Sequence, residues 1–141
     1  MSVDLEIRQD IGLLMLRVIG HPAEGRHEGV RQEVLDLLAG GAVQRLALDL
    51  RRQSASVLSG PTVRSMLVSY DRVLSRFYPD PDDALHVAII SQPGSFGQGI
   101  ARMLLGHAWG LDHLRLSQFD TPEEAAPFLG LPEDWDAPPP S

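Results

Sequence analysis

Residues 86–107, HVAIISQPGSFGQGIARMLLGH, decide the fold of this chain. A short apolar run reaches the turn residues Pro93 and Gly94, and a helical pattern follows them. Ser95 and Gln98 are three residues apart, which fits a capping box at the start of that helix. The stretch therefore predicts a buried strand that turns directly into a helix.

The glycines of this turn raise an alternative, a cradle for phosphate. Dinucleotide-binding folds carry G-x-G-x-x-G after their first strand, whereas Gly94, Gly97 and Gly99 give the reversed order late in the chain. Asp120 ends the next strand, roughly where a ribose-binding acid is expected. Gly97 and Gly99 each weaken a helix by about 1 kcal/mol relative to alanine, so a strand or a ligand should pack closely against them. We favour strand-to-helix architecture, with an incidental anion site at the helix N-terminus, over nucleotide binding.

Strands and helices alternate on both sides of this stretch. Strands are predicted by apolar alternation or short apolar runs, and helices by apolar residues at helical spacing. The order β-β-α-β-α-β-α-β-α predicts one α/β domain with a single mixed, mostly parallel sheet, an antiparallel first strand and covering helices. The predicted strands are 3–9, 11–20, 45–50, 85–91 and 113–119, and the predicted helices lie within 21–41, from Pro61 to Phe77, over 95–107 and over 121–130.

The composition excludes several chemistries. The chain has 141 residues, enough for one domain with an ordinary core, and it has no cysteine, which excludes thiol nucleophiles and zinc-thiolate sites. All 12 basic residues are arginine, which removes lysine Schiff bases and phosphate loops of the Walker type. A net charge of -7 argues against nucleic acid. With no export signal and no apolar run of about 20 residues, we expect a cytoplasmic protein.

The C-terminal end is marked by a second capping box. Thr121 and Glu124 fit the start of the last helix, and residues 132–141 are proline-rich and acidic. We expect residues 1–131 to form the domain and 132–141 an exposed tail, with Trp135 as its one anchor.

No metal site and no catalytic residue is expected. His21, Glu24, His27 and Glu28 lie close enough in sequence to suggest a divalent cation. They lack the His-Glu-x-x-His order, and His21 precedes a proline, so an exposed polar face is the preferred interpretation. No serine stands in a Gly-x-Ser-x-Gly setting, and an enzyme is the least favoured class. No cofactor is expected.

Four segments together resemble a known family. They are the strand RLALDL, the serine-rich loop ending in SG, the strand LHVAII and the closing FDTPEEAAPFLG. In this order they resemble the SpoIIAA-like branch of the STAS domains, which comprise anti-sigma-factor antagonists and sulfate-transporter C-terminal domains. The resemblance extends roughly over residues 3–131 at the level of pattern. It implies a small α/β domain that binds a protein partner and regulates rather than catalyses.

The resemblance points to the loop after the third strand. Antagonists of this kind carry Asp-Ser-Ser/Thr-Gly there, and a partner kinase phosphorylates the first hydroxyl residue. An ungapped count places Val57 and Leu58 where the aspartate and the acceptor should stand, so the usual phosphoacceptor motif is not retained. The alternative is that the hydroxyls of this loop only cap the next helix and solvate the chain. The expected regulatory residues are Ser54, Ser56, Ser59, Gly60 and Thr62.

A second function stays open, because SpoIIAA-like domains also look similar to CRAL-TRIO lipid-transfer proteins. That likeness implies a carrier or sensor of a small apolar ligand or lipid, or association with a membrane surface, through the helix 95–107. The alternative is that two apolar surfaces only form the core of the domain. They are the apolar face of this helix, which includes Leu104 and Trp109, and the stripe from Val63 to Phe77. A homodimer through sheet edges or helices is a further expectation. The expected ligand-binding residues are Ser95, Phe96, Gly97, Ile100 and Met103.

Overall fold

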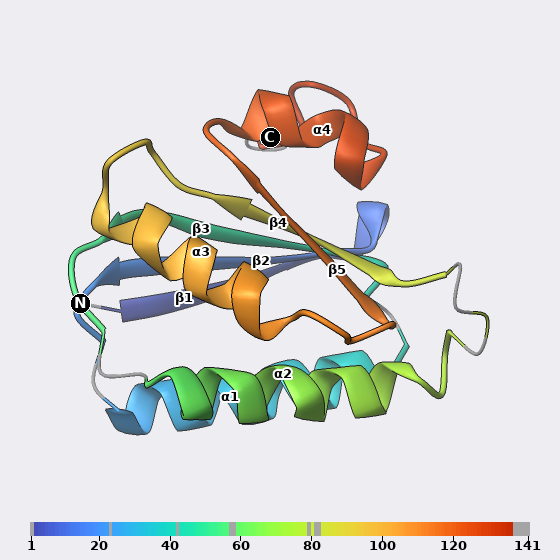
Figure 1. Cartoon of the computed structure of the whole chain (residues 1–141). Coiled ribbons are helices and arrows are strands. Elements are labelled where there is room, and N and C mark those ends of the chain that lie inside the picture. The colour runs from blue at the N-terminus through green and yellow to red at the C-terminus, as the bar shows by residue number, and fades with distance from the viewer. Residues whose placement is uncertain are drawn as a thin grey trace.

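The computed structural model describes residues 2–22, 24–41, 43–56, 59–78, 80 and 83–136. Its elements follow the predicted order along the chain (Figure 1). They are β1 Ser2–Arg8, the 3-10 turn η1 Gln9–Ile11, β2 Leu13–Gly20, α1 Glu24–Ala39, β3 Arg45–Gln53, α2 Gly60–Leu74, β4 Leu85–Ile90, α3 Phe96–His107, β5 Leu114–Phe119 and α4 Pro122–Leu129.

The five strands form one sheet in the order β1-β2-β3-β4-β5. β1 runs antiparallel to β2, and every later neighbour is parallel, as predicted. The register aligns Leu14, Leu46, Val87 and Leu116 in one row across four strands. Since neighbours along each strand point to opposite faces, the next row begins with Met15 and supplies the other face. The sheet is therefore apolar on both sides and needs cover on both.

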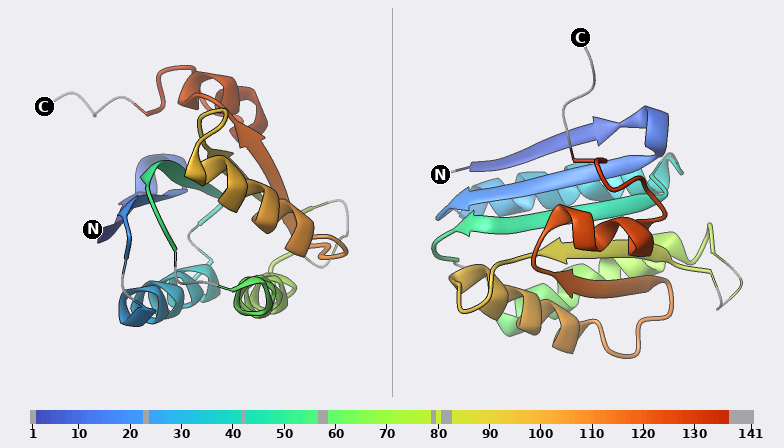
Figure 2. Two further views of the ribbon diagram at one scale, coloured as in Figure 1. Left: turned by 60° about the vertical axis from the view of Figure 1, so that its left-hand side comes forward. Right: turned by 90° about the horizontal axis from the view of Figure 1, so that it is seen from above.

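The helices divide between these two faces (Figures 1 and 2). α1, α2 and α3 lie on one side, where the Leu14 row joins the larger apolar cluster. α4 lies on the other side, where Met15, Ala47 and Ala88 form a smaller cluster with α4 and Trp135. The predicted covering helices are confirmed, and the three-helix face holds most of the core.

Three helices begin at side-chain caps that the sequence indicates. The hydroxyls of Ser59, Ser95 and Thr121 accept the backbone N–H groups of Thr62, Gln98 and Glu124 respectively. Each cap satisfies one of the free donors at a helix N-terminus. With these caps, α2, α3 and α4 each begin within one residue of the position predicted from the sequence.

Three predicted elements differ from the structure by two residues or more at one end. β3 extends to Gln53, three residues past the predicted end, because Arg52 and Gln53 still pair with the end of β2. α2 ends at Leu74, so Phe77 does not belong to the helical stripe; it is 43% exposed, with its ring beside Gly41. The predicted turn at residues 9–10 is a 3-10 turn that delays β2 to Leu13.

The described part of the C-terminal segment returns to the sheet. Trp135 is buried, its Nε1 donates to the carbonyl oxygen of Pro122 at 2.8 Å, and its own carbonyl oxygen accepts from Arg8 at 2.8 Å. Residues 135 and 136 are thus packed rather than exposed, with Trp135 as the anchor. Residues 137–141 of the predicted tail lie outside the described residues. Within the described part of the chain, the helices are too short or too polar to span a membrane.

Candidate functional site

The loop between β3 and α2 separates its hydroxyl residues into two groups. Ser54 follows β3 directly and donates its backbone N–H to Gly20, while Ser56 is half-buried and faces the interior. Ser59 and Thr62 lie together at the start of α2, both exposed, with their hydroxyl oxygens 2.9 Å apart. Val57 and Leu58, where the family motif would stand, lie outside the described residues. Of the expected regulatory residues, the structure therefore groups Ser59, Gly60 and Thr62.

The end of α3 meets the start of α2 at this point. Nε2 of His107 lies 3.0 Å from the position that a Cβ on Gly60 would take. The Arg64 guanidinium donates to the carbonyl oxygens of His107 and Trp109, which fixes the turn after α3 against the first turns of α2. Gly60 is therefore a contact between two helices as well as a helix start.

The position predicted for Trp109 from the sequence is wrong. It was expected on the apolar face of the helix 95–107, but α3 ends at His107 and the Trp109 side chain is 84% exposed. The glycines on either side, Gly106 and Gly110, were the sequence signal that the helix ends before this residue. We define the α2–Trp109 surface as Ser59, Thr62, Arg64, His107 and Trp109.

The expected ligand residues of α3 separate into two sets. Ser95 caps the helix and Phe96 is 43% exposed, so neither faces the core. Gly97 lies against the Leu50 carbonyl of β3 and leaves no room for a ligand there. Ile100 and Met103 do line an internal cavity. Of the five expected ligand-binding residues, Ile100 and Met103 are thus the two that line this cavity.

That cavity has a volume of about 140 Å³ and lies between the sheet and α1, α2 and α3. Its wall is almost entirely aliphatic, with side chains from all five strands and all three helices. Tyr70 of α2 is part of the wall, and burial raises the pKa of its phenol well above the ordinary value. The other polar members of the wall are Arg31, Gln53 and Ser56.

Two polar atoms in this wall are buried without a partner in the described part of the protein. They are Nε of Arg31 and Oε1 of Gln53. Gln53 is only 8% exposed, and its Nε2 already donates to the carbonyl oxygen of Ala55 at 3.1 Å. Its Oε1 is therefore a buried hydrogen-bond acceptor in a residue that lines the cavity. Buried polar atoms in native proteins nearly always have partners, so these two are candidates for hydrogen bonds to a bound molecule or to water.

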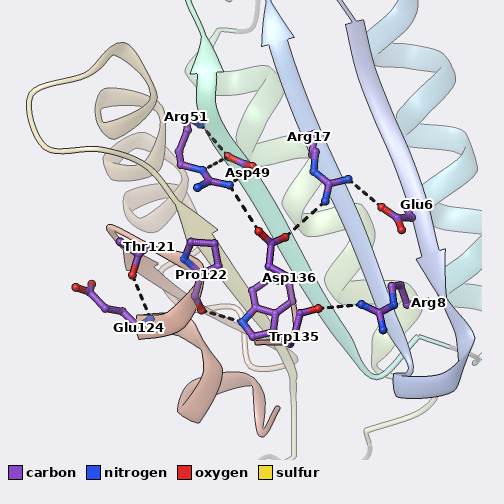
Figure 3. Close-up of polar contacts among 10 residues, drawn as sticks. All are labelled: Glu6, Arg8, Arg17, Asp49, Arg51, Thr121, Pro122, Glu124, Trp135 and Asp136. Carbon is purple, nitrogen blue, oxygen red and sulfur yellow. Dashed lines mark hydrogen bonds and ion pairs between the residues drawn. The ribbon is translucent and has the colours of Figure 1, made fainter. Parts of the chain in front are cut away.

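A polar cluster on the opposite face of the sheet has a structural role (Figure 3). Asp49 accepts from Nε of Arg51 at 3.0 Å and from Nη2 at 2.8 Å. Asp136 lies 3.5 Å from Arg17 and 4.0 Å from Arg51, so the cluster ties the C-terminal segment to β2 and β3. Sequence reasoning missed it because Asp49 lies within an apolar run that reads as a buried strand.

The two carboxyl groups of this cluster have opposite pKa shifts. Burial alone would raise the pKa of Asp49, but the hydrogen bonds and charge of Arg51 outweigh it and hold that pKa below the ordinary value. Burial raises the pKa of Asp136, and the charges of Arg17 and Arg51 offset this only in part. The arginines therefore stabilise the charged form of Asp49 by more than burial disfavours it, whereas for Asp136 burial outweighs the arginines.

Two other motifs of the sequence, the histidine and glutamate group and the glycine motif, form no ligand site in the described residues. No group of three or more histidine, aspartate or glutamate side chains suited to a metal ion occurs there, although the side chains of Glu24 and His27 lie outside that part. Gly94 has a φ of 73°, the left-handed geometry of a turn, and Gly97 contacts the protein itself. The strand-to-helix turn thus accounts for Gly94 and Gly97 of the G-x-x-G-x-G motif, and Gly99 has no such contact.

Comparison with known proteins identifies the fold. No family model matches the chain, and no curated protein matches its sequence. Among solved structures, the anti-sigma factor antagonist SpoIIAA in its unphosphorylated form matches with a TM-score of 0.59 and 15% identity, over 89% of this chain and 94% of that chain. The chain has a SpoIIAA-like STAS fold. At this identity the likeness shows the fold, which confirms the architecture that the sequence pattern implied.

Proposed function

We propose that the protein is a non-enzymatic regulatory module that binds a protein partner through the α2–Trp109 surface. The observation that carries the proposal is Trp109, a large side chain that is 84% exposed and whose carbonyl oxygen accepts from Arg64 of α2, the helix that Ser59 caps. Tryptophan is enriched among the residues that dominate binding energy at interfaces. The SpoIIAA-like fold supports the proposal, because SpoIIAA itself is an anti-sigma factor antagonist.

Ser59 and Thr62 supply the regulatory element of this proposal. A phosphate on either hydroxyl would add about -1.5 to -2 charges at the N-terminus of α2, where anions are favoured by about 0.3 to 2 kcal/mol. Such a charge leaves the fold intact and changes the surface that a partner meets. The regulation is expected to act on docking and not on folding.

A photo-crosslinking phenylalanine analogue at position 109, which keeps an exposed aromatic ring there, tests the interface in the native host. Phe77 is the matched control position, because it is also an exposed aromatic residue, 43% exposed, but follows the opposite end of α2. We expect one crosslinked protein from position 109 and none from position 77. Equal labelling from both positions, or none from position 109, would contradict the proposal.

Ser59→Asp and Ser59→Asn form a matched pair for the regulatory element. Aspartate and asparagine both cap helices as well as serine does, so both variants keep α2, and only aspartate adds charge. We expect Ser59→Asp to reduce the crosslink from position 109 and Ser59→Asn to preserve it. An equal effect of the two variants would show that the charge has no role.

A carrier or sensor of a small apolar molecule is the second candidate, and the cavity of about 140 Å³ favours it. Native mass spectrometry of the protein from its own host tests it by detecting a retained molecule. The same spectrum measures covalent phosphate and the number of subunits, and fragmentation of the protein shows whether a phosphate lies within residues 54–62. The expected homodimer and the cytoplasmic location stay predictions.

A further inference from the structure

We infer that the internal cavity is a binding site for a small, neutral, mostly apolar molecule that carries a hydroxyl group, of the size and kind of phenol. The inference deepens the second candidate function and rests on it. It follows from the size of the cavity, from its aliphatic wall and from the two unpaired polar atoms of Gln53 and Arg31.

The size of the cavity limits the ligand to a few heavy atoms. Its volume is about 140 Å³. An engineered apolar cavity of about 150 Å³ in another protein stays free of water and binds benzene. A single six-membered ring therefore fits this space, and a long acyl chain exceeds it.

The aliphatic wall and Gln53 define the chemistry of the ligand. Nε2 of Gln53 already donates to Ala55, so Oε1 is the atom of this amide that has no partner, and it needs a hydrogen-bond donor. A hydroxyl group donates to this oxygen, and its lone pairs suit a donor such as Nε of Arg31. Burying such atoms without a partner destabilises the protein by the free energy of their desolvation. A hydrogen bond to the hydroxyl of a ligand recovers that free energy.

An anionic ligand fits less well. A carboxylate has no proton to donate to Oε1 of Gln53 and would be brought out of water among aliphatic side chains. The charge of Arg31 is also partly matched already, because its Nη1 lies 3.6 Å from Glu28 and its Nη2 donates to Ser69 at 3.2 Å. We therefore expect the neutral hydroxyl to be preferred over the carboxylate.

Methionine methyl groups provide the test. Met66 and Met103 line the cavity, whereas Met15 is buried in the cluster on the opposite face of the sheet. The full chain is labelled with ¹³C at the methionine methyl groups and titrated with phenol, toluene, benzoate or decanoate. The full chain has four methionines. Met15→Leu, Met66→Leu and Met103→Leu assign the three signals used here, since this swap nearly conserves volume.

We expect phenol to shift the Met66 and Met103 signals saturably and to leave Met15 unmoved. Toluene has nearly the same shape without the hydroxyl, so it should bind about 3- to 10-fold more weakly, the loss of one hydrogen bond. In Gln53→Leu the preference for phenol over toluene should fall to about 1 because the acceptor is gone. An unmoved Met15 signal in this variant shows that it is folded.

A second variant removes the space and leaves the acceptor in place. Val87→Phe adds a ring to the cavity wall in the middle of β4. We expect it to abolish the shifts by phenol and toluene alike while the Met15 signal persists.

Other outcomes overturn the inference. Equal shifts of the Met15, Met66 and Met103 signals would show non-specific contact, and tighter binding of benzoate than of phenol would refute the neutral ligand. Shifts of Met66 and Met103 by decanoate but not by phenol would overturn this ligand class and leave the carrier function standing. No shift with any of the four probes would remove both.

Discussion

Gly97 of α3 lies so close to the carbonyl oxygen of Leu50 in β3 that a methyl group at Gly97 would overlap it. Gly99, two residues along the same helix, has no heavy atom within 4 Å of the position its Cβ would take, apart from its chain neighbours and its own helix. The first glycine lets the helix approach the sheet, and the second serves no packing purpose. The contact between Gly97 and Leu50 therefore sets the distance between α3 and β3.

The two glycines therefore respond to alanine in opposite ways. We expect Gly97→Ala to lower the free energy of unfolding by about 1 to 3 kcal/mol through overpacking. We expect Gly99→Ala to raise it by about 0.5 to 1 kcal/mol, the difference in helix propensity. Urea unfolding at neutral pH measures both. A stable Gly97→Ala variant would show that α3 does not need its close approach to β3.

These glycines also show what could be read from the sequence. A helix-weakening residue just after a strand-to-helix turn predicts a close neighbour, and Gly97 has one. The identical argument failed at Gly99, because sequence spacing does not tell which side of the first turn faces the sheet. Strand order, helix starts and the parallel sheet were predictable, since apolar periodicity and caps are local signals.

The candidate site was predicted less completely. Ser59 and Thr62 were named because they flank a helix start, but the contact of Trp109 with α2 depends on Arg64, 45 residues away in sequence. The unpaired oxygen of Gln53 was also out of reach, since the chain was expected to leave β3 before that residue. Both features depend on contacts between residues far apart in sequence, and a local sequence pattern does not predict such contacts.

The caps of α2 and α3 give a second prediction, which separates stability from binding. We expect Ser59→Ala and Ser95→Ala each to lower the free energy of unfolding by about 1 kcal/mol, the usual value of a serine N-cap. If the α2–Trp109 surface binds the partner, only Ser59→Ala should also weaken the crosslink from position 109. Urea unfolding and crosslink yield measured on both variants decide this, and a matching loss of crosslink in Ser95→Ala would mean that stability alone controls it.

Asp49 makes the protein sensitive to acid. Its pKa in the folded state lies below the ordinary value of about 3.9. The stability it contributes is therefore fully present above the ordinary pKa and is lost as the pH falls through the lower folded-state value. We expect Asp49→Asn to cost about 1 to 2 kcal/mol at pH 7, because the hydrogen bonds to Arg51 lose their charge, and to cost little near pH 2. Urea unfolding across this pH range would contradict the assignment if the loss were the same at both ends.

Asp136 should behave in the opposite way, although it lies beside two arginines. Its pKa is raised because burial outweighs the attraction of Arg17 and Arg51. The neutral form is favoured by folding, so its contribution is present below the ordinary pKa and is lost as the pH rises through the raised value. We expect Asp136→Asn to change stability at pH 7 by less than about 0.5 kcal/mol, or to raise it slightly. A loss comparable with that of Asp49→Asn would show that the Asp136 ion pairs are stabilising.

The two tryptophans form the last pair of predictions, one for stability and one for binding. Trp135 is 4% exposed and donates to Pro122, whereas Trp109 is 84% exposed. Trp135→Phe should lower the free energy of unfolding by about 1 to 3 kcal/mol, because it leaves a buried carbonyl oxygen without its donor and shrinks a packed side chain. Trp109→Ala should change stability by less than about 0.5 kcal/mol, since its indole ring is in solvent. The same Trp109→Ala variant should lose the partner that is crosslinked from a neighbouring position such as Thr62. Retention of that partner at full yield would leave the exposed indole without a role in recognition and would direct the search for the interface away from the end of α3.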